Sequence, residues 1–289
     1  MNIQWFPGHM AKTRRLLSEN LKLIDVVIEL LDARIPNSSK NPEIDRIILN
    51  KPKVLVLNKS DLADEKVSAE WSKWYSDNGQ TSIFVDSIKG RGISKLKSLL
   101  ADLRREKIER EKSKGRLFRP IRTMVVGIPN VGKSSFINRI AGRASAATGD
   151  KPGVTRGKQW IKLNKDIELL DTPGILWPKF DDQEVGLNLA FTGAIKDEIF
   201  DTIEVAALLL ERLSVSYPDY LAKRFKLDSL EGNTGRVLLE EAAKNRGCII
   251  SGGRIDYSRI AATVLDEFRG GKIGRISLEI PNSRDEHNE

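Results

Sequence analysis

Two hydrophobic patterns alternate along the first half of the chain. Short apolar runs occur at 25–31, 53–57, 82–86 and 121–126. Such runs predict strands, and the all-apolar middle of 53–57 is typical of a parallel strand that is covered on both faces. Stretches with helical spacing lie between them, at about 11–23, 43–49, 67–78, 93–112 and 135–141. This alternation predicts an α/β fold with a mostly parallel, doubly wound sheet.

The pattern changes further along the chain. Residues 157–163 and 166–170 indicate a hairpin, and from about residue 201 apolar residues recur with helical spacing in 203–213, 237–243 and 260–268. We therefore expect a small α-helical domain after the sheet. The expected divisions are an N-terminal segment and helix at 1–24, the α/β domain at 25–199 and the helical domain at 200–289, with a disordered tail at 281–289.

The charge of the chain is positive and unevenly distributed. The formal net charge is +8, with 35 Lys and Arg against 25 Asp and Glu in residues 1–199 and 13 against 15 in residues 200–289. A basic excess favours an anionic partner such as nucleic acid. Residues 104–122 carry nine Lys and Arg against three Glu. That stretch is either a basic contact surface or a solvated helix with its own ion pairs, and both interpretations stay open.

Cysteine content and hydropathy limit where the protein works. Cys248 is the only cysteine, which excludes an intrachain disulfide and a cysteine metal cluster. The apolar run at 21–31 is short and contains Lys22, Asp25 and Glu29. The first residues lack a signal-peptide core. We expect a cytoplasmic monomer with no membrane partner.

The strongest motif lies between a predicted strand and a predicted helix. Gly127-Ile-Pro-Asn-Val-Gly-Lys-Ser134 has the form of a phosphate-binding P-loop. Its glycines let backbone N–H groups face phosphate oxygens, Lys133 reaches the β- and γ-phosphates, and the Ser134 hydroxyl can ligate Mg²⁺. The residues that we expect at the phosphates are Asn130, Val131, Gly132, Lys133, Ser134 and Ser135.

A second motif predicts which base is bound. Asn58-Lys-Ser-Asp61 directly follows the predicted strand at 53–57. The Asp61 carboxylate can accept hydrogen bonds from the ring N–H and the exocyclic amine of guanine, a donor pair that adenine lacks. Asn58 would tether the loop and contact the base, and the stem of Lys59 would cover its face. Together with the P-loop, this motif predicts GTP as the ligand.

Further parts of a GTPase site follow. Asp86-Ser87-Ile88-Lys89 is similar to the turn whose backbone N–H groups contact the guanine carbonyl, with Ile88 in place of the usual Ala. Thr155 resembles the switch threonine that ligates Mg²⁺ when the γ-phosphate is present. In Asp171-Thr-Pro-Gly174, the carboxylate can hold Mg²⁺ through water and the Gly174 N–H can bond the γ-phosphate.

The order of these motifs is unusual, because the base motifs precede the P-loop. A circular permutation of a Ras-like domain explains that order, since it leaves the site unchanged in space. The chain therefore resembles the circularly permuted GTPases. Within them it is most similar to the bacterial ribosome biogenesis GTPase A group, on the motifs Trp5-Phe-Pro-Gly-His-Met10, Asp32-Ala-Arg34, Asn58–Asp61, Gly127–Ser134, Pro152-Gly-Val-Thr155 and Asp171–Gly174.

The resemblance implies a GTP-hydrolysing assembly factor that binds the large ribosomal subunit, or its precursor, in the GTP state and is released after hydrolysis. It also implies an rRNA-binding role for the helical domain. Three alternatives remain open: a GTPase acting on tRNA or another RNA, a signalling switch with a protein partner, and a nucleotide-gated RNA-binding module with negligible turnover.

The catalytic group is not obvious from the motifs. Ile175 follows Gly174 and cannot orient water. We expect Lys133, Thr155 and Gly174 to act on the phosphates, and His9 to position the nucleophile or else to serve as a turn residue that packs or binds RNA. Asn130 resembles the asparagine that ligates K⁺ in cation-stimulated GTPases, so the expected cofactors are Mg²⁺ and K⁺.

Overall fold

The computed structural model describes residues 10–48, 51–113, 120–142, 159–172, 174, 176 and 182–281. The chain divides into two compact units. We call Phe6–Pro178 together with Ser277–Glu289 the sheet unit, and Met1–Trp5 together with Lys179–Ile276 the helical unit. The sequence places the boundary near residue 200, whereas the contacts place it near residue 179, because the helix that begins at Gln183 packs with the helices that follow it.

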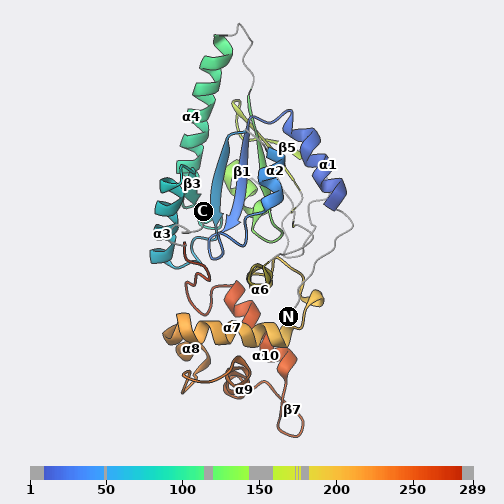
Figure 1. Ribbon diagram of the computed structural model, residues 1–289, viewed down its shortest axis with the longest axis vertical. Helices are drawn as coiled ribbons and strands as arrows, with labels where there is room; N and C mark the ends of the chain where they lie inside the picture. Colours follow the sequence, from blue (N-terminus) through green and yellow to red (C-terminus); the bar gives the residue numbers. More distant parts are fainter. Residues whose placement is uncertain are drawn as a thin grey trace, which may run out of the picture. The chain divides into compact units, whose positions relative to one another are not determined.

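The sheet unit has six strands in the order β3-β2-β1-β4-β6-β5 (Figure 1). All neighbouring pairs are parallel except β5 and β6. The strands are β1 (Val26–Asp32), β2 (Lys53–Asn58), β3 (Ser82–Phe84), β4 (Ile121–Gly127), β5 (Gln159–Lys162) and β6 (Ile167–Asp171). The predicted mostly parallel sheet is confirmed.

Helices cover the sheet because its central strands are apolar on both faces. The helices of this unit are α1 (Met10–Leu21), α2 (Pro42–Ile48), α3 (Glu65–Asp77), α4 (Ile93–Lys112) and α5 (Lys133–Ala141). Leu17 of α1 and Ile44 of α2 pack in one cluster with Val27, while Trp71 of α3 packs in another with Leu31. Helix α5 contacts β4 and β6, and α4 contacts α5. Every residue of β1 is buried as a result.

The strand order reverses between β1 and β4. The chain adds β2 and β3 on one side of β1, and then places β4, β6 and β5 on the other side. In register, Asp32 lies opposite Asn58, and Leu30 lies opposite Gly127. Ligands of doubly wound sheets bind at the carboxyl ends of the strands where the order reverses. The P-loop and the Asn58 motif both begin at that point.

The helical unit is built around α7. Its elements are α6 (Gln183–Phe191), the 3-10 helix η1 (Asp197–Ile199), α7 (Thr202–Ser216), α8 (Pro218–Phe225), α9 (Gly235–Asn245), β7 (Ile249–Ile250), β8 (Arg254–Ile255) and α10 (Tyr257–Arg269). Helix α7 contacts α6, α8, α9 and α10. Gly235 allows the tightest approach, because a Cβ there would lie 1.9 Å from the Ala207 carbonyl oxygen. The predicted helical character is correct, but the small β7–β8 hairpin was not predicted.

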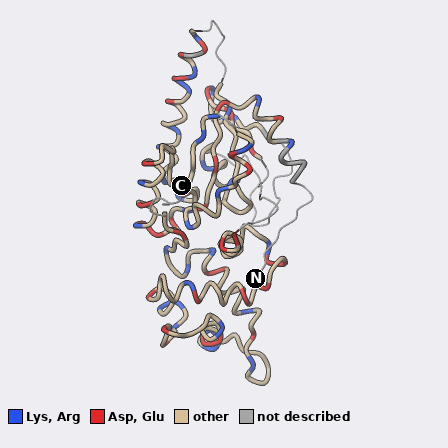
Figure 2. The backbone as a smooth tube through the Cα atoms, viewed as in Figure 1, with Lys and Arg blue, Asp and Glu red and all other residues tan. Residues whose placement is uncertain are grey.

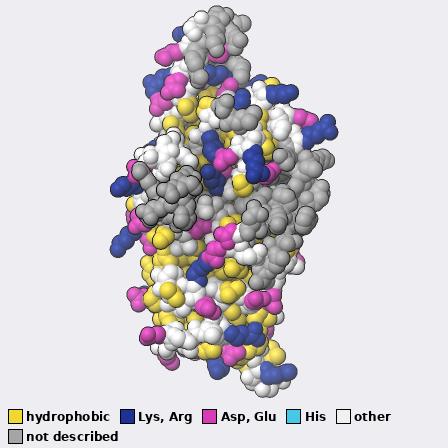
Figure 3. Space-filling model, in the orientation of Figure 1, with side chains coloured by type: hydrophobic (Ala, Val, Ile, Leu, Met, Phe, Trp, Pro, Cys, Tyr) yellow, Lys and Arg dark blue, Asp and Glu magenta, His cyan; other side chains and the backbone are white. Residues whose placement is uncertain are grey.

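Many of the basic side chains take part in ion pairs within their own unit. On α4, Arg105 pairs with Asp102, Arg104 pairs with Asp166, and Lys and Arg interleave with Asp and Glu along the helix (Figure 2). On the face seen in Figure 3, the described Lys and Arg side chains are likewise interspersed with acidic ones. The described part of 104–122 therefore favours the ion-paired helix, and residues 114–119 lie outside the described ranges.

Basic side chains of the helical unit are also paired. Arg224 and Arg246 both donate to the Glu267 carboxylate, at 2.8 and 3.0 Å. Arg269 donates to Asp197 and to the carbonyl oxygens of Ala190 and Phe191. These arginines hold helices together.

Among the described helices, none is long and apolar enough to cross a membrane.

Candidate nucleotide site

The P-loop connects β4 to α5 and has the geometry that its glycines predict. Gly132 stands before α5 with φ of +94°, and Asn130 also has a positive φ, of +55°. A Cβ at Gly132 would lie 2.5 Å from the Asn58 amide nitrogen, and one at Gly127 would lie 2.6 Å from the Leu30 carbonyl oxygen. Side chains at these two positions would clash, so the loop depends on both glycines.

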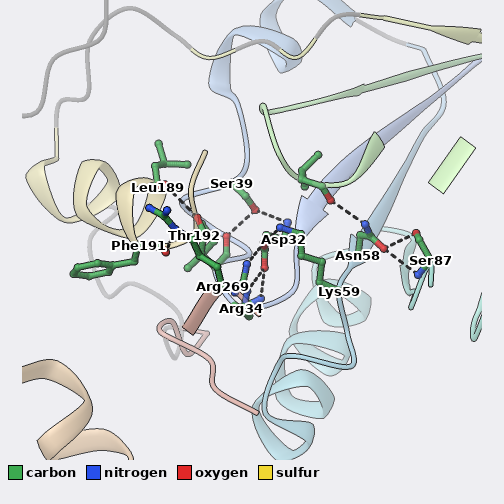
Figure 4. Close-up of polar contacts among 12 residues, drawn as sticks. Asp32, Arg34, Ser39, Asn58, Lys59, Ser87, Leu189, Phe191, Thr192 and Arg269 are labelled. Carbon is green, nitrogen blue, oxygen red and sulfur yellow. Dashed lines mark hydrogen bonds and ion pairs between the residues drawn. The ribbon is translucent and has the colours of Figure 1, made fainter. Parts of the chain in front are cut away.

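Asn58 ties the base motifs to the P-loop (Figure 4). Its amide Nδ2 donates to the Val131 carbonyl oxygen at 2.9 Å, and its Oδ1 accepts from the Ser87 hydroxyl at 2.6 Å. The Ser87 backbone N–H lies 3.3 Å from the same oxygen. The side chain is almost completely buried. One residue therefore joins three segments that are far apart in the sequence.

The Asp86 carboxylate shapes the turn that follows it. Its Oδ1 accepts from the backbone N–H groups of Ile88 and Lys89, at 2.9 and 2.8 Å. Arg139 of α5 donates its Nε–H to the Ser87 carbonyl oxygen at 2.8 Å, which links the turn to the helix of the P-loop. The Ile88 and Lys89 N–H groups, which the sequence assigns to the guanine carbonyl, would have to share their hydrogen bonds with Asp86.

Lys133 is buried beneath the loop. Its Nζ donates to the carbonyl oxygens of Gly127 and Ile128, at 3.2 and 3.1 Å. Burial lowers the pKa of Lys133 from its ordinary 10.5 to about 8, although the nearby Asp171 carboxylate acts in the opposite direction. A Cβ at Gly174 would lie 3.0 Å from this Nζ. The end of β6 thus comes next to the P-loop, as the predicted site requires.

The Asn58–Asp61 loop is fixed from β1. Lys59 has φ of +58°, and its Nζ lies 3.0 Å from the Asp32 carboxylate. Arg34 binds the same carboxylate through Nε at 2.9 Å and through a terminal amine at 2.8 Å. Burial alone would raise the pKa of Asp32, but the charges of Arg34 and Lys59 outweigh it and hold that pKa well below its ordinary 3.8. Asp61 is half-buried.

Sequence reasoning assigned no site role to Asp32, Arg34 or Arg139. A signal for the first two exists, since Asp32-Ala-Arg34 directly follows a fully buried strand. No sequence signal marks Arg139, because its contact with Ser87 depends on how α5 packs. His9, Thr155 and Ile175 lie outside the described residues, so their predicted roles stay predictions.

Oxygen donors suited to Mg²⁺ lie around the P-loop. Ser134 carries its hydroxyl in the first turn of α5, and the Asp171 carboxylate is buried at the end of β6. Mg²⁺ takes hard oxygen ligands of this type together with phosphate oxygens and water. Among the described residues, no group of three or more His, Cys, Asp or Glu could hold a metal. The donor set that is present fits an ion that enters with a nucleotide.

Known proteins are similar in sequence to this chain over nearly its whole length. A family profile described as 50S ribosome-binding GTPase matches residues 122–224. Ribosome biogenesis GTPase A of Bacillus cereus is 50% identical over 281 residues, which cover 97% of this chain and 95% of that protein. The chain belongs to the ribosome biogenesis GTPase A family. The Bacillus pumilus member is 48% identical, with coverage of 98% and 100%.

Solved structures agree with this family assignment. GDP-bound YlqF of Thermotoga maritima has a TM-score of 0.68 at 26% identity and covers 92% of this chain and 99% of its own. The GNP-bound form has a TM-score of 0.67, with coverage of 94% and 99%. The predicted family, the permuted GTPase fold and the GTPase activity are confirmed. The family profile begins at β4 and leaves out the base motifs, which precede the P-loop in this permuted chain.

Proposed function

We propose that this protein binds and hydrolyses GTP at the carboxyl edge of β1, β2, β4 and β6, and that it assists assembly of the large ribosomal subunit. The observation that carries the proposal is the Asn58 side chain, which bonds the P-loop and the Ser87 turn at once. Phosphate recognition and guanine recognition thereby share one rigid connection. An adenine nucleotide would gain nothing from Asp61, since it lacks the donor pair that this carboxylate accepts.

Each part of the nucleotide has its own set of residues in this proposal. Guanine is held by Asn58, Lys59, Asp61, Asp86, Ser87 and Ile88. The phosphates are held by Asn130, Val131, Gly132, Lys133, Ser134, Ser135 and Gly174. Ser134, Thr155 and, through water, Asp171 would hold Mg²⁺, which neutralises phosphate charge when it is bound. Asn130 would contribute an oxygen to a K⁺ ion.

Base recognition can be tested by reversing one hydrogen bond. Asp61→Asn replaces an acceptor with an amide that donates, which mismatches the guanine amine and suits the extra carbonyl of xanthine. We expect GDP affinity to fall by about tenfold or more, in line with a cost of 1–3 kcal/mol for unpaired polar groups. XDP should bind the variant better than GDP. Unchanged GDP affinity would remove Asn58–Asp61 as the base site.

The catalytic role of His9 needs a matched pair of variants. His9→Ala should lower the rate of GTP hydrolysis with little change in GTP affinity, because a group that positions water acts after binding. The only other histidine, His287, provides the control, and His287→Ala should behave like the wild type. Normal turnover in His9→Ala, measured with the activating partner present, would exclude this role.

The ribosomal partner is proposed from the names of the relatives, which are ribosome biogenesis GTPase A proteins. The γ-phosphate and Mg²⁺ would hold the Thr155 loop in the GTP state only, so binding to the subunit should depend on the nucleotide. We expect the protein to associate tightly with large subunits, in sedimentation, in a non-hydrolysable GTP analogue and only weakly in GDP. Contacts to rRNA should also weaken steeply as salt rises, because they release counterions.

The deciding experiment exchanges the nucleotide. Large subunits should stimulate GTP hydrolysis by the wild type, whereas Asp61→Asn should respond to XTP instead. This exchange ties the response to the site on this chain and excludes a contaminating GTPase. Stimulation by naked RNA or by a protein in place of subunits would indicate one of the other partners. Equal sedimentation in GDP and in the analogue would contradict nucleotide gating.

A further inference from the structure

The last described residues return to the sheet unit. The helical unit ends at Ile276, and residues 277–281, which we call the C-terminal strap, pack with the sheet unit. Residues 270–276 separate the strap from α10 in the chain, and its hydrogen bonds reach residues near the ends of β1 and β2. Ser277 is buried, Glu279 is half-buried and Ile280 is 66% exposed. The strap therefore has one face in contact and one free.

Glu279 binds the loop that follows β1. Its carboxylate accepts from the Asn37 backbone N–H at 2.6 Å and from the Ser38 backbone N–H at 3.0 Å. The Ser38 hydroxyl donates to the same carboxylate. Charged hydrogen bonds of this kind are stronger than neutral ones. The carboxylate thus fixes the backbone of the loop that follows Asp32 and contains Arg34.

The strap is also connected to Lys59 of the base motif. The Leu278 backbone N–H donates to the Arg34 carbonyl oxygen at 2.9 Å. The Arg34 guanidinium holds Asp32, and Asp32 in turn holds Lys59. The Ala33 N–H donates to the Asn58 carbonyl oxygen at 2.8 Å. The strap is therefore linked to Lys59 of the base motif through two residues, Arg34 and Asp32.

A second set of bonds reaches the other end of the base loop. The Asp64 backbone N–H donates to the Ser277 hydroxyl at 3.1 Å, and the Asp64 carboxylate caps α3. Trp71 of α3 donates its indole N–H to the Glu279 carbonyl oxygen at 3.1 Å. Residues 58–63 thus lie between two anchors, the loop after β1 and the start of α3. The strap holds both.

We propose that the C-terminal strap is a positioning element for guanine recognition, with Glu279 as its main contact. The inference rests on the proposed function, since it assumes that Asn58–Asp61 reads the base. Specificity at Asp61 requires its carboxylate to stand at hydrogen-bonding distance from two guanine donors. A loop that is anchored at both ends provides that position in advance, and loosening the anchors lowers affinity for the base.

The test compares guanine with hypoxanthine in the full-length protein. Hypoxanthine lacks the exocyclic amine, so the ratio of GDP to IDP affinity reports how well Asp61 is positioned. Glu279→Ala should weaken GDP binding by about tenfold, within the 5–150-fold that is typical of coupling between sites, and should lower the GDP-to-IDP ratio by about threefold. Ile280→Ala, on the exposed face of the same strap, should bind both nucleotides like the wild type.

The GDP affinity and the GDP-to-IDP ratio together distinguish the possible outcomes. A folded Glu279→Ala protein with unchanged GDP affinity, or with equal losses for GDP and IDP, would overturn the role of the strap. If that variant does not fold, two milder variants are judged by the same ratio: Glu279→Gln, which replaces one acceptor oxygen with an amide nitrogen and removes the charge, and Ser38→Ala, which removes only the hydroxyl bond. Asp61→Asn serves as the reference. If Asp61→Asn leaves GDP binding intact, the assignment of the base site is wrong. If Asp61→Asn weakens GDP binding and the Glu279 variants do not, the base site stands and only the strap proposal fails.

Discussion

The buried amine of Lys133 makes nucleotide binding depend on pH. In the empty protein its pKa is about 8, because burial beneath the P-loop disfavours the charged form. A bound nucleotide places phosphate oxygens beside this amine and keeps it protonated. Binding above pH 8 therefore requires uptake of a proton. Between about pH 7 and pH 9 the protonated fraction of the empty site falls from about nine-tenths to about one-tenth, so GDP affinity should fall by about tenfold.

The same linkage gives a second measurable quantity. At pH 8, about half of the empty sites hold the proton, so binding should take up about half a proton per GDP. Calorimetric titrations in buffers of different ionisation enthalpy measure that number directly. Lys133→Met is the control, because it removes this amine while leaving every other titrating group of the protein and the nucleotide. The reasoning is refuted if wild type and Lys133→Met show the same proton uptake and the same slope of affinity with pH.

The empty protein should show the opposite trend in its stability. The pKa of Lys133 is lower in the folded chain than in the unfolded chain, where it is 10.5. Between about pH 8 and pH 10.5 the unfolded state therefore binds the proton more readily, and the contribution of this group to stability rises with pH. Urea unfolding without nucleotide, compared between wild type and Lys133→Met, isolates that contribution.

Three further predictions concern other parts of the molecule. Gly235→Ala places a methyl group against the Ala207 carbonyl between α7 and α9, so unfolding in urea should show a loss of about 2 kcal/mol or more. Glu267→Gln weakens the bonds to its two arginines, and the loss should be about 2 kcal/mol at neutral pH. The pairing holds the pKa of Glu267 below 4.5, so this difference should vanish as the pH falls through the lowered pKa. GTP hydrolysis should be faster in K⁺ than in Na⁺ if Asn130 contributes to a K⁺ site, and Asn130→Ala should abolish that preference.

Local sequence determined the strands and the motif loops of this protein. β2 is recognisable because its middle is a continuous apolar run, and β1 and β4 are recognisable because most of their residues are apolar, as burial on both faces of the sheet requires. The P-loop is recognisable because its glycines have no substitutes, since a Cβ at Gly132 would clash with Asn58. The order of the motifs was sufficient to predict the permutation, because moving the chain ends to another surface loop leaves the arrangement of the strands unchanged. Each strand and each motif lies within a few consecutive residues.

Only the tertiary structure decided how the parts are connected. Asn58 and Val131 are 73 positions apart, and Glu279 and Asn37 are 242 positions apart. No short pattern marks such pairs, because the two partners belong to distant segments that only the fold brings together. The same holds for Arg224 and Arg246, which lie 43 and 21 positions from Glu267 and which the fold pairs with it. The β7–β8 hairpin was missed because strands of two residues are too short to show a period.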